Sequence, residues 1–154
     1  MNSYKAILNT IRRHQKFLVV SHYNPDADAI GSSLVVAMFL KSLGKQVQVL
    51  NEDACPQWLK FLPGTSMLRK ASEVKKVDYE VAIIVDCGDF KRISSVEEFI
   101  VPGRPVINID HHVTNDKFGT VNMLDAKASS TCEMMFDLLK EAKCPLTKIG
   151  RAHV

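Results

Sequence analysis

Three short apolar segments constrain the fold of this chain more than any other feature of its sequence. They are FLVV at 17–20, VAIIV at 81–85 and VINI at 106–109. Each is too short for a helix and rich in β-branched residues, which is typical of strands buried in a parallel sheet. The segment VQVL at 47–50 is a fourth candidate. The sequence therefore predicts a sheet of mainly parallel strands at the centre of the fold.

Helical patterns lie between and after these segments. Apolar residues recur at helical spacing from Asp28 onward, and Gly44 is placed to end that helix. Near the other end of the chain, Ser130 and Glu133 have the spacing of a capping box, and an apolar helical face follows them. We therefore expect an α/β, doubly wound, Rossmann-like fold with a mainly parallel sheet and helices on both of its faces.

Length and composition restrict the class of protein. The chain has 154 residues, the size of one globular domain, and its formal charge of +3 comes from 20 basic and 17 acidic residues without a long run of either sign. We expect neither duplex DNA nor a membrane as a partner, and a homodimer stays open as the oligomeric state. The four cysteines form no C-x-x-C pair, so we expect thiols and a cytoplasmic protein.

Acidic and histidine side chains follow three of the predicted strands. The first group is His22, Asp26 and Asp28, within SHYNPDADAIGS at 21–32. Carboxylates and an imidazole packed this closely destabilise one another when bare, whereas a divalent cation makes their proximity favourable. An alternative is that Asp28 caps the following helix and that Asn24 to Asp26 form an ordinary turn, but it leaves His22 unexplained.

The second and third groups follow the other two strands. Asp86 comes directly after residues 81–85, and Asp110, His111 and His112 come directly after residues 106–109. One acid in such a place is a common loop residue, but its recurrence after three strands favours a shared site at the sheet edge. Adjacent histidines in an extended segment point in opposite directions, so only one of them is expected to reach a metal. Lysines and arginines are scattered, and none is assigned to phosphate.

These groups, in this order, resemble the motifs of the DHH phosphoesterase family, which is named after a triplet found here at 110–112. The segment from His22 to Ser32 resembles the first motif, DCGD at 86–89 the second, and the triplet with Asn115 the third. The segment ASSTCE at 128–133 is similar to the branch of bifunctional oligoribonucleases and phosphoadenosine-phosphate phosphatases. The resemblance covers nearly the whole chain.

The resemblance implies a ligand set for two metal ions. One ion would be held by His22, Asp26 and Asp86, and the other by Asp28, Asp86 and His111, so that Asp86 bridges them. Mixed carboxylate and imidazole ligands suit Mn²⁺, whereas Mg²⁺, which stays an alternative, prefers oxygen ligands and zinc recruits fewer carboxylates. We therefore expect two Mn²⁺ ions as cofactors.

The resemblance also implies an activity and the residues that carry it. The expected reaction is the two-metal hydrolysis of short oligoribonucleotides, of 3′-phosphoadenosine 5′-phosphate, or of both. His112 would contact the scissile phosphate as a catalytic and substrate-binding residue, and Asp110 would be its supporting acid. Asn115, Ser130 and Thr131 would border the substrate.

The family pattern continues beyond what this sequence contains. Residues 1–150 are expected to be the N-terminal part of a DHH catalytic domain, without the acid of the fourth motif or the C-terminal substrate domain, and 151–154 a non-native or disordered tail. Three alternatives stay open. They are a manganese inorganic pyrophosphatase, which would have a His where Cys87 stands, a cyclic-dinucleotide phosphodiesterase, and a noncatalytic nucleotide-binding module or inactive fragment.

Overall fold

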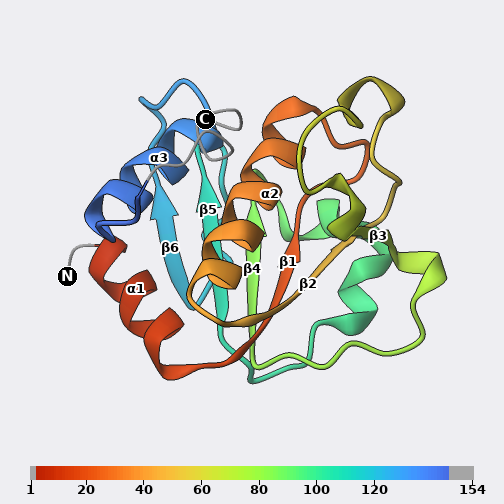
Figure 1. The fold of residues 1–154 in the computed structure, drawn as a ribbon, viewed down its shortest axis with the longest axis horizontal. Coiled ribbons are helices and arrows are strands. Elements are labelled where there is room, and N and C mark those ends of the chain that lie inside the picture. The colour runs from red at the N-terminus through yellow and green to blue at the C-terminus, as the bar shows by residue number, and fades with distance from the viewer. Residues whose placement is uncertain (1–2, 146–154) are drawn as a thin grey trace.

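The computed structural model describes residues 3–145, which form a six-stranded, wholly parallel sheet in the order β3-β2-β1-β4-β5-β6 (Figure 1). The α/β, doubly wound fold predicted from the sequence is confirmed. The strands are β1 Lys16–Val20, β2 Gln46–Asn51, β3 Leu68–Lys70, β4 Val81–Val85, β5 Val106–Asp110 and β6 Val121–Leu124. The α-helices are α1 Ser3–Arg13, α2 Ala27–Ser42 and α3 Thr131–Glu141.

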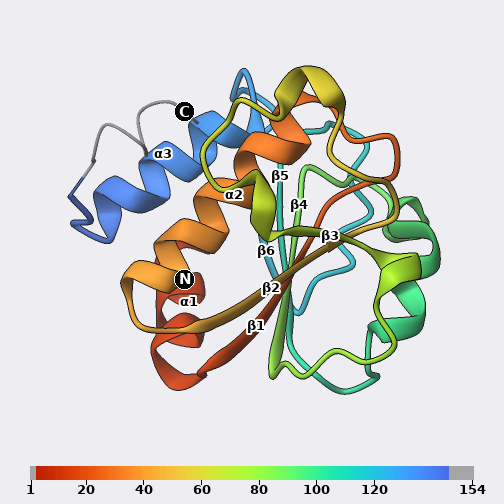
Figure 2. The same cartoon turned by 45° about the vertical axis from the view of Figure 1, so that its right-hand side comes forward.

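The two faces of the sheet are covered by different kinds of helix. All three α-helices lie on one face, and short 3-10 helices with their loops cover the other (Figure 2). These are η3 Ala71–Glu73 and η4 Phe90–Phe99, while η1 Gln57–Leu59 and η2 Thr65–Met67 lie in the loop after β2. Helices occupy both faces, as predicted, but those on the second face are 3-10 helices and not α-helices.

The core is divided by the alternation of side chains along each strand. Val19 and Ile83 pack under the α-helices, whereas their neighbours Val20 and Ile84 pack under the 3-10 side. Both sets are almost fully buried. This burial on both faces explains why the strands read as continuous apolar runs in the sequence.

The ends of α2 and α3 are capped much as the sequence predicts, with two differences in the residues that do so. Asp26, and not Asp28, caps α2, because its carboxylate accepts the backbone N–H groups of residues 28 and 29 at 3.0 Å each. Gly44, with a φ of 73°, follows the end of this helix as expected. At α3 the Ser130 hydroxyl accepts the Glu133 N–H at 3.0 Å, but the Glu133 carboxylate reaches back to Ser129 instead of completing the box with Ser130.

The sequence interpretation missed β3 and β6, which are the two short edge strands. Within residues 3–145 no helix is long and apolar enough to cross a bilayer. The tail predicted at 151–154 lies outside the described residues. The chain changes direction across the sheet between β1 and β4, so the crevice at the carboxyl ends of these two strands is the usual ligand-binding position for such a sheet.

Candidate metal centre

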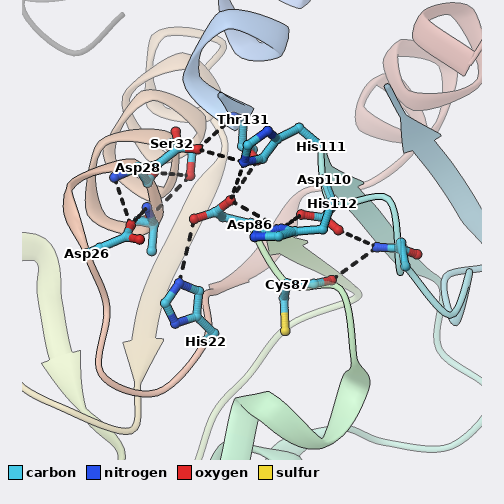
Figure 3. Close-up of polar contacts among 12 residues, drawn as sticks. His22, Asp26, Asp28, Ser32, Asp86, Cys87, Asp110, His111, His112 and Thr131 are labelled. Atoms are coloured by element: carbon cyan, nitrogen blue, oxygen red, sulfur yellow. Dashed lines mark hydrogen bonds and ion pairs between the residues drawn. The ribbon is translucent and has the colours of Figure 1, made fainter. Parts of the chain in front are cut away.

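The three groups predicted from the sequence converge at the carboxyl ends of β1, β4 and β5 (Figure 3). His22 lies just after β1, Asp86 directly after β4, and Asp110 is the last residue of β5. His111 and His112 follow it at the same edge of the sheet. Parallel pairing in register places these strand ends side by side, so residues up to about 90 positions apart in sequence lie at the same edge of the sheet.

Asp86 lies at the centre of this cluster. Its Oδ2 is 3.6 Å from His22 Nε2, and its Oδ1 is 3.8 Å from His111 Nε2. The residue is 1% exposed and has a φ of 53°, in the left-handed region that Asp tolerates better than most residues. A backbone held in a sparsely populated conformation at a strand end is typical of functional sites. The turn brings one carboxylate between two imidazoles.

The imidazoles are held in orientations suited to a metal. A carbonyl oxygen can only accept, so the 2.7 Å contact between His22 Nδ1 and the Tyr23 carbonyl requires the proton on Nδ1. His111 Nδ1 faces the Ala128 carbonyl at 3.3 Å in the same way. Both rings then present the Nε2 lone pair to the carboxylates. Donation of the other ring N–H to a backbone carbonyl is how metal-binding histidines are commonly fixed.

The separations between these donors also fit a shared ion. Nitrogen-to-oxygen distances of 3.6 to 3.8 Å are too long for hydrogen bonds. Ligands bound at about 2.1 Å to one ion lie roughly 3.0 to 3.5 Å apart, so a small contraction would bring these atoms into a coordination shell. The donor set present here therefore fits a divalent cation better than it fits direct hydrogen bonding.

Two groups of residues 3–145 bring potential ligand atoms within 4.8 Å of one another: His22, Asp26 and Asp86, and Asp86, His111 and His112. Asp86 belongs to both. The first group is the set implied for one ion. In the second group His112 stands where Asp28 was expected, although the Asp28 carboxylate lies 3.7 Å from His111 Nε2 and so borders the same space.

Asp28 has a second set of partners. Its two carboxylate oxygens accept the backbone N–H groups of Thr131 at 2.7 Å and Cys132 at 2.8 Å. The carboxylate thus lies at the N-terminus of α3, where the helix dipole favours a negative charge. The alternative from the sequence, that Asp28 caps the helix that contains it, is wrong, because Asp26 is the N-cap of α2 and the Asp28 carboxylate binds the first N–H groups of α3.

Asp110 holds His112 in place. Its Oδ1 accepts from His112 Nδ1 at 2.7 Å, and its Oδ2 accepts from the Asn115 amide at 2.7 Å. Asp110 is fully buried, whereas the His112 side chain is 39% exposed. Gly88 packs against this pair, since a Cβ there would lie 3.4 Å from Asp110 Oδ2 and from the His112 Cβ, about the distance of an ordinary contact. A buried acid thus orients a partly exposed imidazole.

The residues implied to border the substrate all hydrogen bond within the protein. The Thr131 hydroxyl donates to Asp86 Oδ1 at 2.9 Å, and the Ser130 hydroxyl caps α3. The Asn115 amide nitrogen contacts Asp110 and, at 2.8 Å, Asn108 Oδ1, while its oxygen accepts the Lys117 N–H. In this structure Thr131 and Asn115 support the two aspartates.

Two residues near the site were not singled out from the sequence. Asn108 is buried within β5 and donates to the carbonyls of Ile84 and Cys87, which ties the ends of β4 and β5 together. An amide inside an apolar strand was the signal for it. Arg92 lies beside His22, and nothing in its sequence context distinguished it from the other scattered cations.

Charge interactions at the site shift two pKa values against the effect of burial. Burial lowers the pKa of His22, but its contacts with Asp86 and with the Tyr23 carbonyl outweigh that effect, so the pKa of His22 is raised. Burial raises the pKa of Asp86, but His22 and Thr131 hold it below its usual value. Burial raises the pKa of the neighbouring Cys87 thiol to about 12, which makes a thiolate ligand unfavourable there.

The sequence of this chain matches the profile of the DHH family, N-terminal domain, over residues 16–152. The chain belongs to the DHH family. The motifs quoted from the sequence are therefore those of a family member, and the edge where they converge is the candidate site of a DHH domain.

Similar proteins include a bifunctional oligoribonuclease and PAP phosphatase of Thermus thermophilus, 34% identical over 79% of this chain and 35% of that protein. A probable bifunctional oligoribonuclease and PAP phosphatase of Streptococcus mutans is 30% identical over 96% of this chain and 46% of its own length. Among solved structures, an exopolyphosphatase-related protein of Bacteroides fragilis matches with a TM-score of 0.86 and 29% identity, over 92% of this chain and 44% of that one. This DHH chain thus spans less than half the length of these relatives.

Proposed function

We propose that this chain is part of a metal-dependent phosphoesterase that hydrolyses short oligoribonucleotides, 3′-phosphoadenosine 5′-phosphate, or both. The observation that carries the proposal is the position of Asp86 between two groups of potential ligands, one containing His22 and the other His111. A carboxylate shared in this way is placed to bridge two ions of a two-metal site. The printed names of the curated relatives support the substrate class.

The proposed ligands are five residues whose donor atoms surround one space. His22, Asp26 and Asp86 would hold the first ion, and Asp86 with His111 and the adjacent Asp28 would hold the second. The mixture of imidazole nitrogen and carboxylate oxygen favours Mn²⁺ over Mg²⁺. When bound, such a pair supplies positive charge that polarises the phosphoryl oxygens and activates a water.

His112 is proposed to contact the phosphate that is attacked. Because Nδ1 donates to Asp110, Nε2 is the ring nitrogen that can hydrogen bond a phosphoryl oxygen or exchange a proton with the leaving oxygen. Asp110 is fully buried and also accepts from Asn115, so it holds the ring in one orientation and stabilises the protonated imidazole.

Calorimetric titration of Mn²⁺ tests the bridged site. The wild-type chain is expected to bind the ion, and Asp86→Asn to weaken binding at least about 100-fold, because the ligand shared by both groups is lost. Asp137→Asn removes an exposed acid on α3 and is the matched control, for which no change is expected. Failure of the wild-type chain to bind any divalent ion would contradict the proposal.

Turnover identifies the substrate. Products are separated and quantified by chromatography for four substrates, each with Mn²⁺, with Mg²⁺ and after chelation. They are mononucleotides from short RNAs, phosphate from 3′-phosphoadenosine 5′-phosphate, phosphate from pyrophosphate, and a linear dinucleotide from a cyclic dinucleotide. The proposal expects activity on one or both of the first two substrates, and this activity should be lost on chelation and be highest with Mn²⁺. A preference for pyrophosphate or the cyclic dinucleotide would assign the chain to another reaction of phosphate transfer.

A further inference from the structure

Arg92 lies beside the metal centre without contributing to it. It belongs to η4, the segment that follows β4, and its carbonyl accepts the Tyr23 N–H at 2.8 Å, which ties this segment to the end of β1. A guanidinium nitrogen lies 3.3 Å from His22 Nδ1, and the guanidinium carbon lies 5.5 Å from the centre of the Tyr23 ring. The Tyr23 side is open, since this residue is 41% exposed.

The charge of Arg92 is not neutralised within residues 3–145, where no carboxylate forms an ion pair with it. His22 does not accept a hydrogen bond from the guanidinium either. Because His22 Nδ1 donates its proton to the Tyr23 carbonyl at 2.7 Å, it presents an N–H and no lone pair to the guanidinium. The half-buried guanidinium is therefore open to an acceptor from elsewhere, and a phosphate matches its planar, forked geometry.

The position of Arg92 decides which phosphate it can reach. The His22 ring presents Nε2 to Asp86 and Nδ1 to Arg92, so the guanidinium and the ligand cluster lie on opposite sides of one imidazole (Figure 3 shows the ring and its contact with Asp86). A phosphate in contact with the proposed ions is therefore separated from Arg92 by the width of the ring. A phosphate bound by Arg92 would therefore be a different one from the phosphate at the proposed ions.

We propose that Arg92, held against the Tyr23 ring, binds a second phosphate of the substrate, one that is not hydrolysed. This inference rests on the proposed function and adds a specificity determinant to it. A second phosphate contact at Arg92 predicts that a nucleotide with phosphates at both ends, or a short oligonucleotide, is preferred over a nucleotide with only the scissile group. Tyr23 restricts the guanidinium through a cation–π contact, which leaves less freedom to lose on binding.

The test compares two ligands that differ only in the second phosphate: 3′-phosphoadenosine 5′-phosphate and adenosine 3′-phosphate. Their affinities are measured by calorimetry with the metal-loaded protein, and kcat/KM is measured for each. Arg92→Gln is expected to weaken binding and lower kcat/KM for the bisphosphate by about 10- to 100-fold, and to change both values for the monophosphate by less than about twofold. Arg92→Lys should fall between, because it keeps the charge but loses the fork.

Lys91→Gln is the matched control, because it removes the same charge from the preceding, exposed residue. It should leave both ligands unaffected. Mn²⁺ titration of Arg92→Gln separates a phosphate contact from an effect on His22: unchanged metal affinity is expected, and a loss there would assign Arg92 a structural role instead. Equal losses for both nucleotides, or no wild-type preference for the bisphosphate, would overturn the inference. If both nucleotides bind but neither is hydrolysed, the proposed function fails while the affinities still decide the role of Arg92.

Discussion

Asp28 and Thr131 are 103 positions apart in the sequence, yet the Asp28 carboxylate accepts the Thr131 backbone N–H at 2.7 Å. The same carboxylate accepts the N–H of Cys132 and lies 3.7 Å from His111 Nε2. One side chain therefore joins the starts of α2 and α3 and also faces the proposed ions. Asp28 is expected to contribute to the stability of the fold before any metal is bound.

Replacing Asp28 by Ala is expected to lower the free energy of unfolding of the metal-free chain by about 1 to 2 kcal/mol, because two backbone donors of α3 lose a charged acceptor that is only 19% exposed. Asp28→Asn should lose less, since its amide oxygen can still accept. Urea denaturation in the presence of a chelator measures both. Equal stability of Asp28→Ala and the wild-type chain would show that the helix-capping contact is not formed in solution.

The hydroxyl of Thr131 is expected to matter for metal binding although it is not a proposed ligand. It donates to Asp86 Oδ1 at 2.9 Å in a fully buried position. Thr131→Val keeps the shape and removes this donor, so the metal affinity should fall about 10-fold or more, as for other residues that orient a ligand. Thr131→Ser keeps the hydroxyl and is the matched control. Similar Mn²⁺ isotherms for the two variants would contradict this role.

Metal binding should weaken as the pH falls. The contact with Asp86 raises the pKa of His22 in the metal-free chain, so a larger share of the imidazole is protonated on Nε2 as the pH falls, and that proton must leave before Nε2 can bind an ion. Calorimetry at pH 6, 7 and 8 in buffers of different ionisation enthalpy is expected to show lower affinity and more protons released per ion at pH 6. An affinity that does not change over this range would contradict the assignment of His22.

His22 and Asp86 also make the stability of the metal-free chain depend on pH, and the contribution of His22 changes in the opposite direction to metal binding. The stability contributed by His22 is fully present below its unfolded pKa of 6.5 and is lost as the pH rises through its higher folded pKa. That contributed by Asp86 is present above its unfolded pKa of 3.8 and is lost as the pH falls through its lower folded pKa. Urea denaturation of the apo chain should therefore show this contribution to be largest between about pH 4 and 6.5 and to disappear in Asp86→Asn.

Asn115 is expected to affect turnover more than metal binding. Its amide fixes Asp110, which in turn fixes His112, so Asn115→Leu should lower kcat about 10-fold or more. The ion held near His22 does not depend on this contact, and its affinity should change little. A variant that loses metal and activity in parallel would show that Asn115 supports the whole site. Asn122→Leu, at a partly buried amide of β6 away from the proposed ligands, controls for loss of a buried amide.

The sequence was enough to predict which residues lie together at the sheet edge where they follow the ends of strands. Asp86 and His111 could be assigned to one edge because parallel strands share their direction, and His22 because a bare cluster of charges needs a counter-ion. The roles of Thr131 and Asn115 could not be assigned, since their hydrogen bonds depend on how α3 and the loop after β5 pack. Arg92 was indistinguishable from the other cations because only tertiary structure shows that it lacks a carboxylate partner among residues 3–145.

The edge strands show the same limit. LRK of β3 and VNML of β6 are short, partly exposed and carry polar residues, so neither has the apolar run that marked the central strands. They form because a neighbouring strand already offers a row of backbone partners. Local sequence is a weak guide to a strand of this kind.

The change of chain direction between β1 and β4 divides the proposed ligands between two halves of the sheet. His22, Asp26 and Asp28 come from the first half, and Asp86 and His111 from the second. Neither half can assemble the centre alone, so uptake of an ion would report that both have docked. A bound metal should therefore stabilise the docked arrangement of the two halves, and a chelator should remove that contribution to the free energy of unfolding.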